Sequence, residues 1–344
     1  MINDFYKNTL NKRCHLAYDE MVRSFRSMKF EVDVQGVSAQ ELPLVYSAVL
    51  EDHPELFYLS HKPSARQKMD FFGGALKLVS SSIFTAGQVG NYKIELDKIV
   101  KNFKKQTENL SSDSQKILFV CDHFLKNVNY EINNDYNQNC ATALIKNKGQ
   151  CSGISKGVKY LLDHLGIDCI VVEGEAHSNG QGGPHAWNMV WVDGDPYHLD
   201  VTNMMGANTS KKEPFYYLYF LASDDDMTVH SWDRNKYPKC NKKCPYKPVN
   251  ASNNQFGNGN RNSPPPMFSD KVVKFSIEME KEIAKAVDKK QDLLCFSTAL
   301  SVEGQELLDE VSKSVRKVVR QKNLGLSFSV KIINGFNVEI TFIY

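Results

Sequence analysis

The sequence predicts an α+β protein, because one central region combines helical periodicity with an antiparallel hairpin. After Cys151, apolar residues recur with the spacing of a single buried stripe on an amphipathic helix. Further along, two runs rich in β-branched and aromatic residues, 185–192 and 196–202, flank the strong hairpin turn Asp193-Gly194. The chain has 344 residues, which exceeds the usual size of one domain, so we expect two or three domains.

The predicted helix begins at Cys151 and ends before Gly166, where a left-handed C-cap is expected. Its apolar stripe consists of Ile154, Val158, Leu161, Leu162 and Leu165. On the first turn of a helix, unpaired N–H groups and the positive end of the dipole favour a thiolate. The same N–H groups can stabilise an oxyanion on an acyl substrate. Taken alone, Cys151 also fits a small buried hydrophobic residue, as free cysteines often are.

The hairpin register changes that balance. A two-residue loop at Asp193-Gly194 places Trp187 opposite Asp200, so His185 lies on the same face and diagonal to the aspartate. A diagonal pair is about 7–8 Å apart along the backbone, within reach of an imidazole bonded to a carboxylate. An odd loop length would move Asp200 to the other face. Cys151, His185 and Asp200 therefore have the residue types of a nucleophile, its proton acceptor and an orienting carboxylate.

Other histidines compete for the same role. His198 faces the same side of the hairpin as the aspartate and is expected either to support the site or to be structural. We place His177 in a solvated glycine-rich loop, and we assign His123 and His164 to predicted helices as structural residues. By this reasoning only His185 has both a nearby carboxylate and the right position in the chain.

These motifs resemble the transglutaminase-like (papain-like) core of a bacterial superfamily of thiol enzymes. The motifs that carry the resemblance are Gly149-Gln150-Cys151, His185-Ala186-Trp187-Asn188-Met189-Val190 and Tyr197-His198-Leu199-Asp200-Val201-Thr202. It extends over roughly residues 40–240, through Glu51 to Leu59, Val128-Asn129-Tyr130, Tyr219-Phe220-Leu221 and His230-Ser231-Trp232. The sequence departs from the pattern at Pro196 and in the stretch 141–144, and both lie near the site.

The resemblance implies roles for the matching residues. Cys151 would attack an acyl carbon, His185 would accept and return the proton, and Asp200 would hold the imidazole. The candidate oxyanion or supporting residues are Gln150, Ser152, Trp187 and His198. We expect a cysteine-dependent peptidase or amidase that acts on a peptide or protein substrate through a thioester. A protein-glutamine transglutaminase and a catalytically silent peptide-binding scaffold remain alternatives.

Composition suggests four segments. Residues 1–109 form a mostly helical N-terminal region, 110–247 the transglutaminase-like core, 248–268 a linker rich in Asn, Gly, Ser and Pro, and 269–344 a small α+β domain. The last segment is expected to be either a protein-docking module or a stabilising appendage. Its terminal hairpin is predicted to turn through a three-residue loop, 333–335, which pairs Ile332 with Phe336 and keeps both apolar sets on one face.

Within the N-terminal region and the start of the core, helices are expected at 4–28, 40–50, 91–108 and 114–127, with a strand from Gly74 toward Phe84. Ser112 offers an N-cap for the last of these helices. The inner face of helix 91–108 is predicted to carry Ile94, Leu96, Ile99, Val100 and Phe103.

Charge and cysteine content limit the other classes of function. A net charge of +2 gives no argument for binding nucleic acid or a membrane. Residues 1–26 contain no apolar signal segment, and eight cysteines without a dense spacing pattern suggest reduced thiols in a cytoplasm. An exported effector without a cleavable signal would look the same. No cofactor is expected, and no metal, since Cys240 and Cys244 with His230 fall short of the four ligands of structural zinc.

Overall fold

The computed structural model describes residues 4–68, 75–110, 112–132, 135–178, 181–208, 211, 217, 219–243, 272–273, 276–291, 293–298, 304–333 and 337–344. The expected linker at 248–268 lies outside the described residues. No helix in the described part of the chain is long and apolar enough to cross a membrane.

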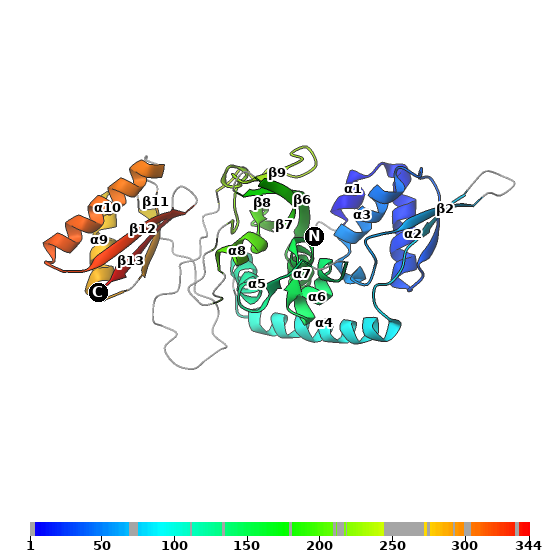
Figure 1. Ribbon diagram of the computed structural model, residues 1–344, viewed down its shortest axis with the longest axis horizontal. Coiled ribbons are helices and arrows are strands. Elements are labelled where there is room, and N and C mark those ends of the chain that lie inside the picture. The colour runs from blue at the N-terminus through cyan, green and yellow to red at the C-terminus, as the bar shows by residue number, and fades with distance from the viewer. Residues whose placement is uncertain are drawn as a thin grey trace.

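A four-stranded antiparallel sheet with a helix against it forms the centre of the molecule (Figure 1). The strands follow the order β8-β7-β6-β9, and their bounds are Cys169–Ser178 (β6), Gln181–Val192 (β7), Asp195–Leu199 (β8) and His230–Trp232 (β9). The helix is α7 (Cys151–His164), which packs on β6 and β7. The predicted α+β fold, with the cysteine-bearing helix on an antiparallel sheet, is confirmed.

The hairpin between β7 and β8 has the predicted register. Val192 pairs with Asp195 across a two-residue turn, and Asp193 and Gly194 both have left-handed φ angles, 52° and 84°. A turn with two left-handed residues matches the twist of the flanking strands, and the loop therefore has two residues, as predicted. The second strand ends at Leu199 rather than at residue 202, because the next residue caps a short helix, α8 (Val201–Ala207).

The prediction of a glycine-rich loop around His177 was wrong. Strand β6 extends to Ser178 and β7 begins at Gln181, and these two residues pair, while residues 179 and 180 lie outside the described part of the chain. The side chain of His177 is exposed, as expected, but it projects from a strand. Gly174 on β6 makes room for a buried indole, since a Cβ there would lie 2.7 Å from the ring of Trp187.

The predicted apolar stripe of α7 is buried among three other helices. Ile154, Val158, Leu161 and Leu162 are all fully buried, and each such side chain contributes about 1.5–3 kcal/mol. The surrounding helices are α5 (Asp113–Asn127), α6 (Cys140–Ile145) and α8. Ser112 caps α5 as predicted, in a capping box with Gln115.

The N-terminal region is less helical than predicted, because it also contains a three-stranded sheet of order β1-β3-β2. The expected helix 4–28 is divided into three pieces by the turn near Leu10 and Asn11. The elements of this region are α1 (Phe5–Thr9), η1 (Lys12–Cys14), α2 (His15–Arg26), β1 (Glu31–Val34), α3 (Leu42–Asp52), η2 (Pro54–Leu56), β2 (Ser64–Lys68) and β3 (Ala75–Val79). The strand prediction from Gly74 corresponds to β3, which ends earlier than expected, and Gly74 itself lies outside the described residues.

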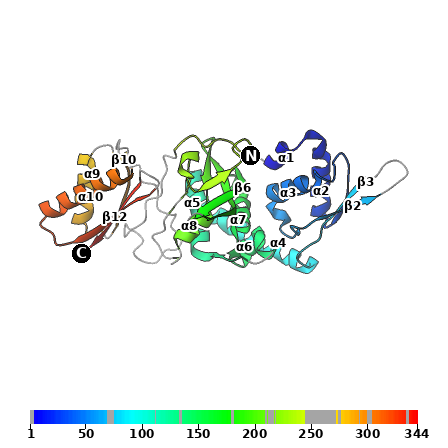
Figure 2. The same ribbon diagram turned by 45° about the horizontal axis from the view of Figure 1, so that its top comes forward.

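Helix α4 (Ala86–Thr107) extends from the N-terminal helices to the central part of the molecule in both Figure 1 and Figure 2. It begins five residues earlier than predicted, since Thr85 and Gln88 form a capping box at its start. Leu96, Val100 and Phe103 are buried as expected. Ile94 was misassigned to the inner face, because its side chain is 56% exposed.

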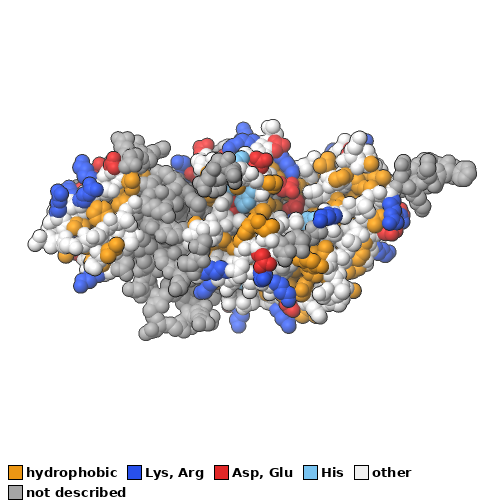
Figure 3. Space-filling view, in the orientation of Figure 1, with side chains coloured by type: hydrophobic (Ala, Val, Ile, Leu, Met, Phe, Trp, Pro, Cys, Tyr) orange, Lys and Arg blue, Asp and Glu red, His pale blue; other side chains and the backbone are white. Residues whose placement is uncertain are grey.

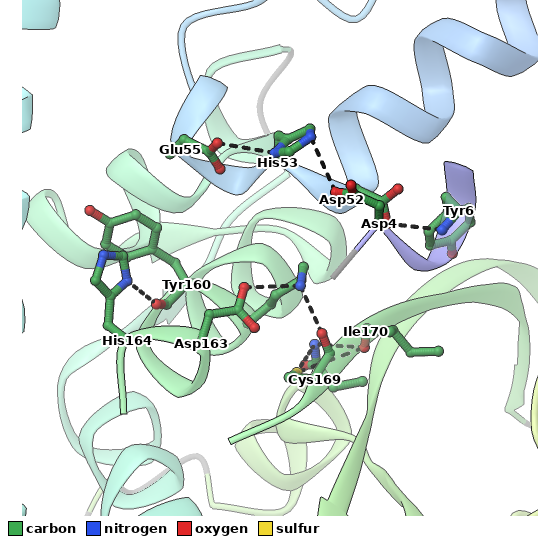
Figure 4. A network of polar contacts seen from close by, with 12 residues as sticks. Asp4, Tyr6, Asp52, His53, Glu55, Tyr160, Asp163, His164, Cys169 and Ile170 are labelled. Carbon is green, nitrogen blue, oxygen red and sulfur yellow. Dashed lines mark hydrogen bonds and ion pairs between the residues drawn. The ribbon is translucent and has the colours of Figure 1, made fainter. Parts of the chain in front are cut away.

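Polar contacts line the boundary between the N-terminal helices and the far end of α7 (Figure 4). A cavity of about 360 Å³ lies here. Its charged side chains bond to protein groups: Arg26 to Glu55 at 2.6 Å, Lys159 to Asp163 at 2.9 Å, and the carboxylate of Asp52 to two backbone N–H groups of α1. The boundary is therefore held by paired charges.

Two separate hydrophobic clusters occur among the described residues. One joins buried side chains from Tyr6 to Cys240, and the other lies between Met279 and Phe342. The first cluster contains residues from both sides of residue 109, where we expected the N-terminal region to end and the core to begin. That domain boundary stays a prediction.

The second cluster fills a small unit with a sheet of order β10-β11-β13-β12. Its elements are β10 (Val272–Val273), α9 (Ser276–Asp288), β11 (Leu293–Thr298), α10 (Gly304–Gln321), β12 (Ser327–Ile333) and β13 (Asn337–Ile343). The predicted register of the terminal hairpin was wrong by two residues, since Ile332 pairs with Val338 rather than with Phe336. A shift by an even number of residues keeps each side chain on the same face of the sheet, so the apolar residues Val330 and Ile340 still share a face. The tip of this hairpin, 334–336, lies outside the described residues.

We expect Gly153→Ala to destabilise the protein, because a Cβ at residue 153 would lie 2.2 Å from the carbonyl oxygen of Asn137. Relieving that clash should lower the free energy of unfolding by about 1–3 kcal/mol. Gly90→Ala is the matched control, since a Cβ there meets nothing within 4 Å on α4. The control should gain up to about 1 kcal/mol. Urea denaturation followed by circular dichroism measures both values, and equal stability of the two variants would contradict the expectation.

Candidate active site

The chain enters α7 through a narrow strand pairing that places Cys151 on the first helical turn. β5 (Lys148–Gly149) pairs in parallel with β4 (Asn129–Tyr130). Gln150 is the N-cap residue in an extended conformation, and its side chain makes no capping hydrogen bond. The first-turn N–H groups are therefore not capped by Gln150 and are available to the thiol and to a substrate oxygen.

The structure brings Cys151, His185 and Asp200 together as the hairpin register predicts. The Nε2 atom of His185 lies 2.8 Å from Oδ2 of Asp200. Because an ionised carboxylate only accepts, Nε2 carries the proton and donates it. The imidazole also hydrogen-bonds the thiol of Cys151, which assigns Nδ1 to that contact. Ser155 Oγ donates to the carbonyl oxygen of Ala186 at 3.1 Å and ties α7 to the strand that carries the histidine.

The surroundings favour an ion pair between thiol and imidazole. Burial opposes the thiolate, but the hydrogen bond and charge of His185, followed by the N–H groups of Ala186 and Ser152, lower the pKa of Cys151 below its ordinary value. Burial also opposes the imidazolium, yet Asp200 and Cys151 raise the pKa of His185 to about 9. Between these two pKa values the pair is thiolate and imidazolium.

Asp200 is fully buried and accepts hydrogen bonds from four donors. Besides His185, they are Nε2 of His230 at 2.8 Å, Nδ2 of Asn203 at 2.6 Å and the backbone N–H of Asn203 at 2.9 Å. Burial alone would raise the pKa of this carboxyl group, but the bonds from His185 and His230 outweigh it and hold the pKa well below its usual range. The carboxylate is therefore charged at every physiological pH.

Sequence reasoning missed His230 and Asn203, and His185 is not the only histidine that contacts the carboxylate of Asp200. Asn203 follows Asp200 by three residues, which is the spacing of an N-cap, and that spacing could have indicated the contact. His230 lies on β9, which reaches the site only because it pairs with β6. The motif His230-Ser231-Trp232 gave its position in the chain but no role.

Trp187 and His198, two of the candidate supporting residues, lie buried in the core next to the site. Trp187 is fully buried, and its Nε1–H donates to Nδ1 of His198 at 3.0 Å. Nε2 of His198 in turn donates to Oδ1 of Asp224 at 2.9 Å. The indole stacks on the ring of His185, with centroids 5.8 Å apart and planes at 22°. These contacts fix the plane of the His185 imidazole.

Ser152 and Tyr130 also contact the thiol of Cys151. The backbone N–H of Ser152 bonds the thiol, while Ser152 Oγ is buried and has no hydrogen-bond partner among the described residues. The hydroxyl of Tyr130 contacts both the sulfur and the backbone N–H of Cys151. Burial and the charge of Cys151 raise the pKa of Tyr130, so its hydroxyl stays protonated. Sequence reasoning placed Tyr130 near the core but assigned it no role at the site.

Among the described residues, two groups of side chains have the donor atoms of a metal site, and within each group these atoms lie within 4.8 Å of one another: His185, Asp200 and His230 form one group, and His198, Asp224 and Cys240 the other. In both groups, hydrogen bonds between protein side chains explain why these atoms lie so close together. In the second group the indole of Trp187 occupies Nδ1 of His198, so Nε2 carries the proton and has no lone pair for a metal. In the first group both Nε2 atoms donate to Asp200. Cys244, part of the rejected zinc motif, lies outside the described residues.

A cysteine at a helix N-terminus, joined by hydrogen bonds to a histidine and an aspartate on an antiparallel sheet, defines the class of papain-like thiol proteins. Comparison with protein families gives the particular family. Residues 101–201 match the model of the transglutaminase-like superfamily core. This segment is therefore similar to the transglutaminase-like core, and it contains Cys151, His185 and Asp200, the last of which lies one residue before its end.

Two solved structures show partial likeness to the chain. One is titled "Putative Cysteine Protease from Cytophaga hutchinsonii", with 14% identity, a TM-score of 0.28, and coverage of 42% of this chain and 63% of that one. The other is titled "Crystal structure of a TGase", without a stated organism, with 14% identity, a TM-score of 0.30 and coverage of 48% of each chain. The chain thus spans less than two thirds of the length of both structures. No curated protein matches the sequence.

Iodoacetamide should alkylate Cys151 at a pH where an ordinary thiol is still protonated, because the pKa of Cys151 is lowered. In His185→Ala the burial effect is no longer outweighed, so the inflection of the rate should move to higher pH. Peptide mapping by mass spectrometry at several pH values gives the rate at each cysteine. Cys140 is a matched internal control, because burial raises its pKa. An inflection that does not move in His185→Ala would contradict the proposed ion pair.

His230→Phe should weaken the hold on Asp200, since it removes one N–H donor from a buried carboxylate. The remaining charge on Asp200 is then less well stabilised, and the pKa of His185 should change with it. His230→Gln keeps an N–H donor and should restore part of the original profile. The alkylation rate of Cys151 against pH reads out the effect, together with thermal unfolding. Identical pH profiles in the wild type and both variants would show that His230 is only a packing residue.

Proposed function

We propose that the protein is a cysteine-dependent acyl-transfer enzyme that acts on peptide or protein amide bonds, most simply as a peptidase or amidase. The observation that carries this proposal is the hydrogen-bonded series Cys151, His185 and Asp200. A thiolate beside an imidazolium is a nucleophile with its proton donor already in place.

In the first step the sulfur of Cys151 attacks the carbonyl carbon of the amide. The carbonyl oxygen becomes an oxyanion, and Nδ1 of His185 gives its proton to the leaving nitrogen. The C–N bond then breaks, the amine departs, and a thioester remains on the cysteine. Asp200 stays ionised and holds the imidazole in this orientation throughout.

The first turn of α7 is the natural place for the oxyanion. The N–H of Cys151 is the candidate donor, and the oxyanion would replace the hydroxyl of Tyr130 that this N–H contacts in the structure. Such donors are worth about 10²–10³-fold in rate when one is removed. Gln150 stays a candidate of the same kind, since its side chain does not cap the helix.

In the second step the neutral imidazole takes a proton from an incoming nucleophile, which attacks the thioester carbon while the C–S bond breaks. If the nucleophile is water, the product is a carboxylic acid and the enzyme is a hydrolase. If it is a primary amine, the product is a new amide and the enzyme is a transglutaminase. We favour hydrolysis, with transamidation as the alternative. A silent peptide-binding scaffold is disfavoured, because binding a peptide does not require the ion pair.

The proposal extends to the setting of the enzyme. We propose a protein or peptide substrate, no cofactor and a cytoplasmic location, since the eight cysteines lack the dense spacing pattern of a disulfide framework. We also propose that residues 269–344 form a separate module for protein docking, on the basis of their own hydrophobic cluster.

Incubation with a glutamine-containing peptide and a labelled primary amine separates the alternatives. We expect Cys151-dependent release of ammonia or an amine, with little label incorporated. Cys151→Ala should lower the rate by about 10³-fold or more. Cys14→Ala is the control, because that thiol is buried away from the site and its pKa is raised. Label incorporation that depends on Cys151 would replace the hydrolase proposal by a transglutaminase, and no reaction with any amide would favour the scaffold.

A further inference from the structure

We propose that Tyr130, Ile132 and Tyr136 form a binding surface for a large apolar side chain of the acyl donor, directly beside the amide that Cys151 attacks. We call these three residues the apolar rim. The inference rests on the proposed function and adds a substrate class to it, namely peptides with a large aliphatic or aromatic residue next to the reacting acyl group.

The segment that carries the apolar rim is bonded to the start of α7. Glu131 N–H donates to the carbonyl oxygen of Gly149, and Gln150 N–H donates to that of Asn137, both at 3.0 Å. The side chain of Asn137 closes the segment on itself by donating to the carbonyl oxygen of Glu131. This arrangement fixes η3 (Asp135–Gln138) and β4 against the first helical turn.

The side chains of the apolar rim are exposed although large. Tyr130 is 48% exposed, Ile132 76% and Tyr136 47%. Of ten large hydrophobic side chains exposed in the described residues, three thus lie within seven positions of one another. Isolated exposed apolar side chains are ordinary on protein surfaces, but a group of them indicates a binding site. On the face shown in Figure 3, hydrophobic side chains gather over the central part of the molecule, next to a histidine.

Aromatic contacts support the apolar rim from below. The ring of Tyr136 lies 5.7 Å from that of Phe84, which in turn lies 5.1 Å from Tyr92. Among the described side chains of this segment, Glu131 is paired with Lys148 at 2.9 Å. The ring contacts and this ion pair hold the surface in place, and its exposed apolar atoms suit an apolar side chain.

The position of Tyr130 identifies the occupant. Its hydroxyl contacts the sulfur and the N–H of Cys151, while its ring belongs to the apolar rim. Any acyl group bound at the sulfur must therefore pass within one side-chain length of the rim. His185 and Ala186 contact the sulfur from β7, whereas Tyr130 contacts it from β4, so the rim borders the site on a different element from the histidine. Of the molecules that visit this site, the acyl donor is the one that stays covalently attached there.

Two alkylating probes test the surface without knowledge of the natural substrate. Iodoacetamide reports only the reactivity of Cys151, and N-(2-phenylethyl)iodoacetamide adds an apolar group that can reach the apolar rim. We expect the second-order rate constant of the phenylethyl probe, relative to iodoacetamide, to be at least about 10-fold higher on Cys151 than on free cysteine, the discrimination typical of one apolar contact site.

Ile132→Ser and Tyr136→Ser should each lower that ratio several-fold and leave the rate with iodoacetamide unchanged. Tyr136→Phe should keep the ratio, because it preserves the ring. The matched control is Leu16→Ser, since Leu16 is 74% exposed and lies in the N-terminal region on α2. Thermal unfolding checks that each variant is folded.

The outcomes separate the two proposals. Two results would overturn this inference alone, provided that Cys151 reacts with iodoacetamide at its normal rate. One is a ratio of the two rate constants equal to that of free cysteine, and the other is a ratio that stays unchanged in both serine variants. An unreactive Cys151 would overturn the proposed function together with it. A ratio that falls in both serine variants but not in Leu16→Ser supports the apolar rim, and a peptide mixture should then show the same preference.

Discussion

The buried carboxylate of Asp200 is the interaction on which the rest of the site depends. A charge with no exposed surface is costly unless donors surround it, and the four donors here come from β7, β9 and α8. Satisfying Asp200 therefore fixes the relative positions of three elements. The same bonds set the tautomer of His185, which leaves Nδ1 facing Cys151. Fold stability and chemical reactivity thus both depend on one carboxylate.

A second constraint is the parity of the β7–β8 turn. With Asp193 and Gly194 both left-handed, the loop has two residues, and His185 and Asp200 fall on one face of the sheet. One inserted residue would turn Asp200 away and bury an unpaired charge. The aspartate also ends its strand and caps α8, because its Oδ1 accepts from the N–H of Asn203. A single residue therefore terminates a strand, begins a helix and orients an imidazole.

Local chemistry in the sequence was enough to predict the central features. The turn residues determined the hairpin register, and the apolar spacing after Cys151 determined α7, so the approach of His185 to Asp200 followed from short-range rules. Features that depend on long-range pairing were missed. His230 joins the site only through the pairing of β9 with β6, which no local pattern encodes. The prediction that Ile94 is buried was wrong for a similar reason. The helical period defines an apolar stripe on α4, but tertiary packing decides how much of that stripe is covered by other elements. The position of Tyr130 at the site could not be predicted either, because it depends on the pairing of β4 with β5.

The contrast among the cysteines supports the proposed role of Cys151 as a nucleophile. Among the six cysteines whose side chains the structure describes, five are buried, and burial raises the pKa of each. Cys151 is also largely surrounded by protein, so burial acts on it in the same direction. Only there do a helix N-terminus and an imidazole outweigh burial and reverse the shift. A merely structural thiol has no use for that reversal, because holding a thiolate beside an imidazolium costs desolvation of two charges. The cost is met by Asp200, which stabilises the imidazolium from the far side. The direction of one pKa shift therefore depends on the whole arrangement of sheet, helix and buried carboxylate.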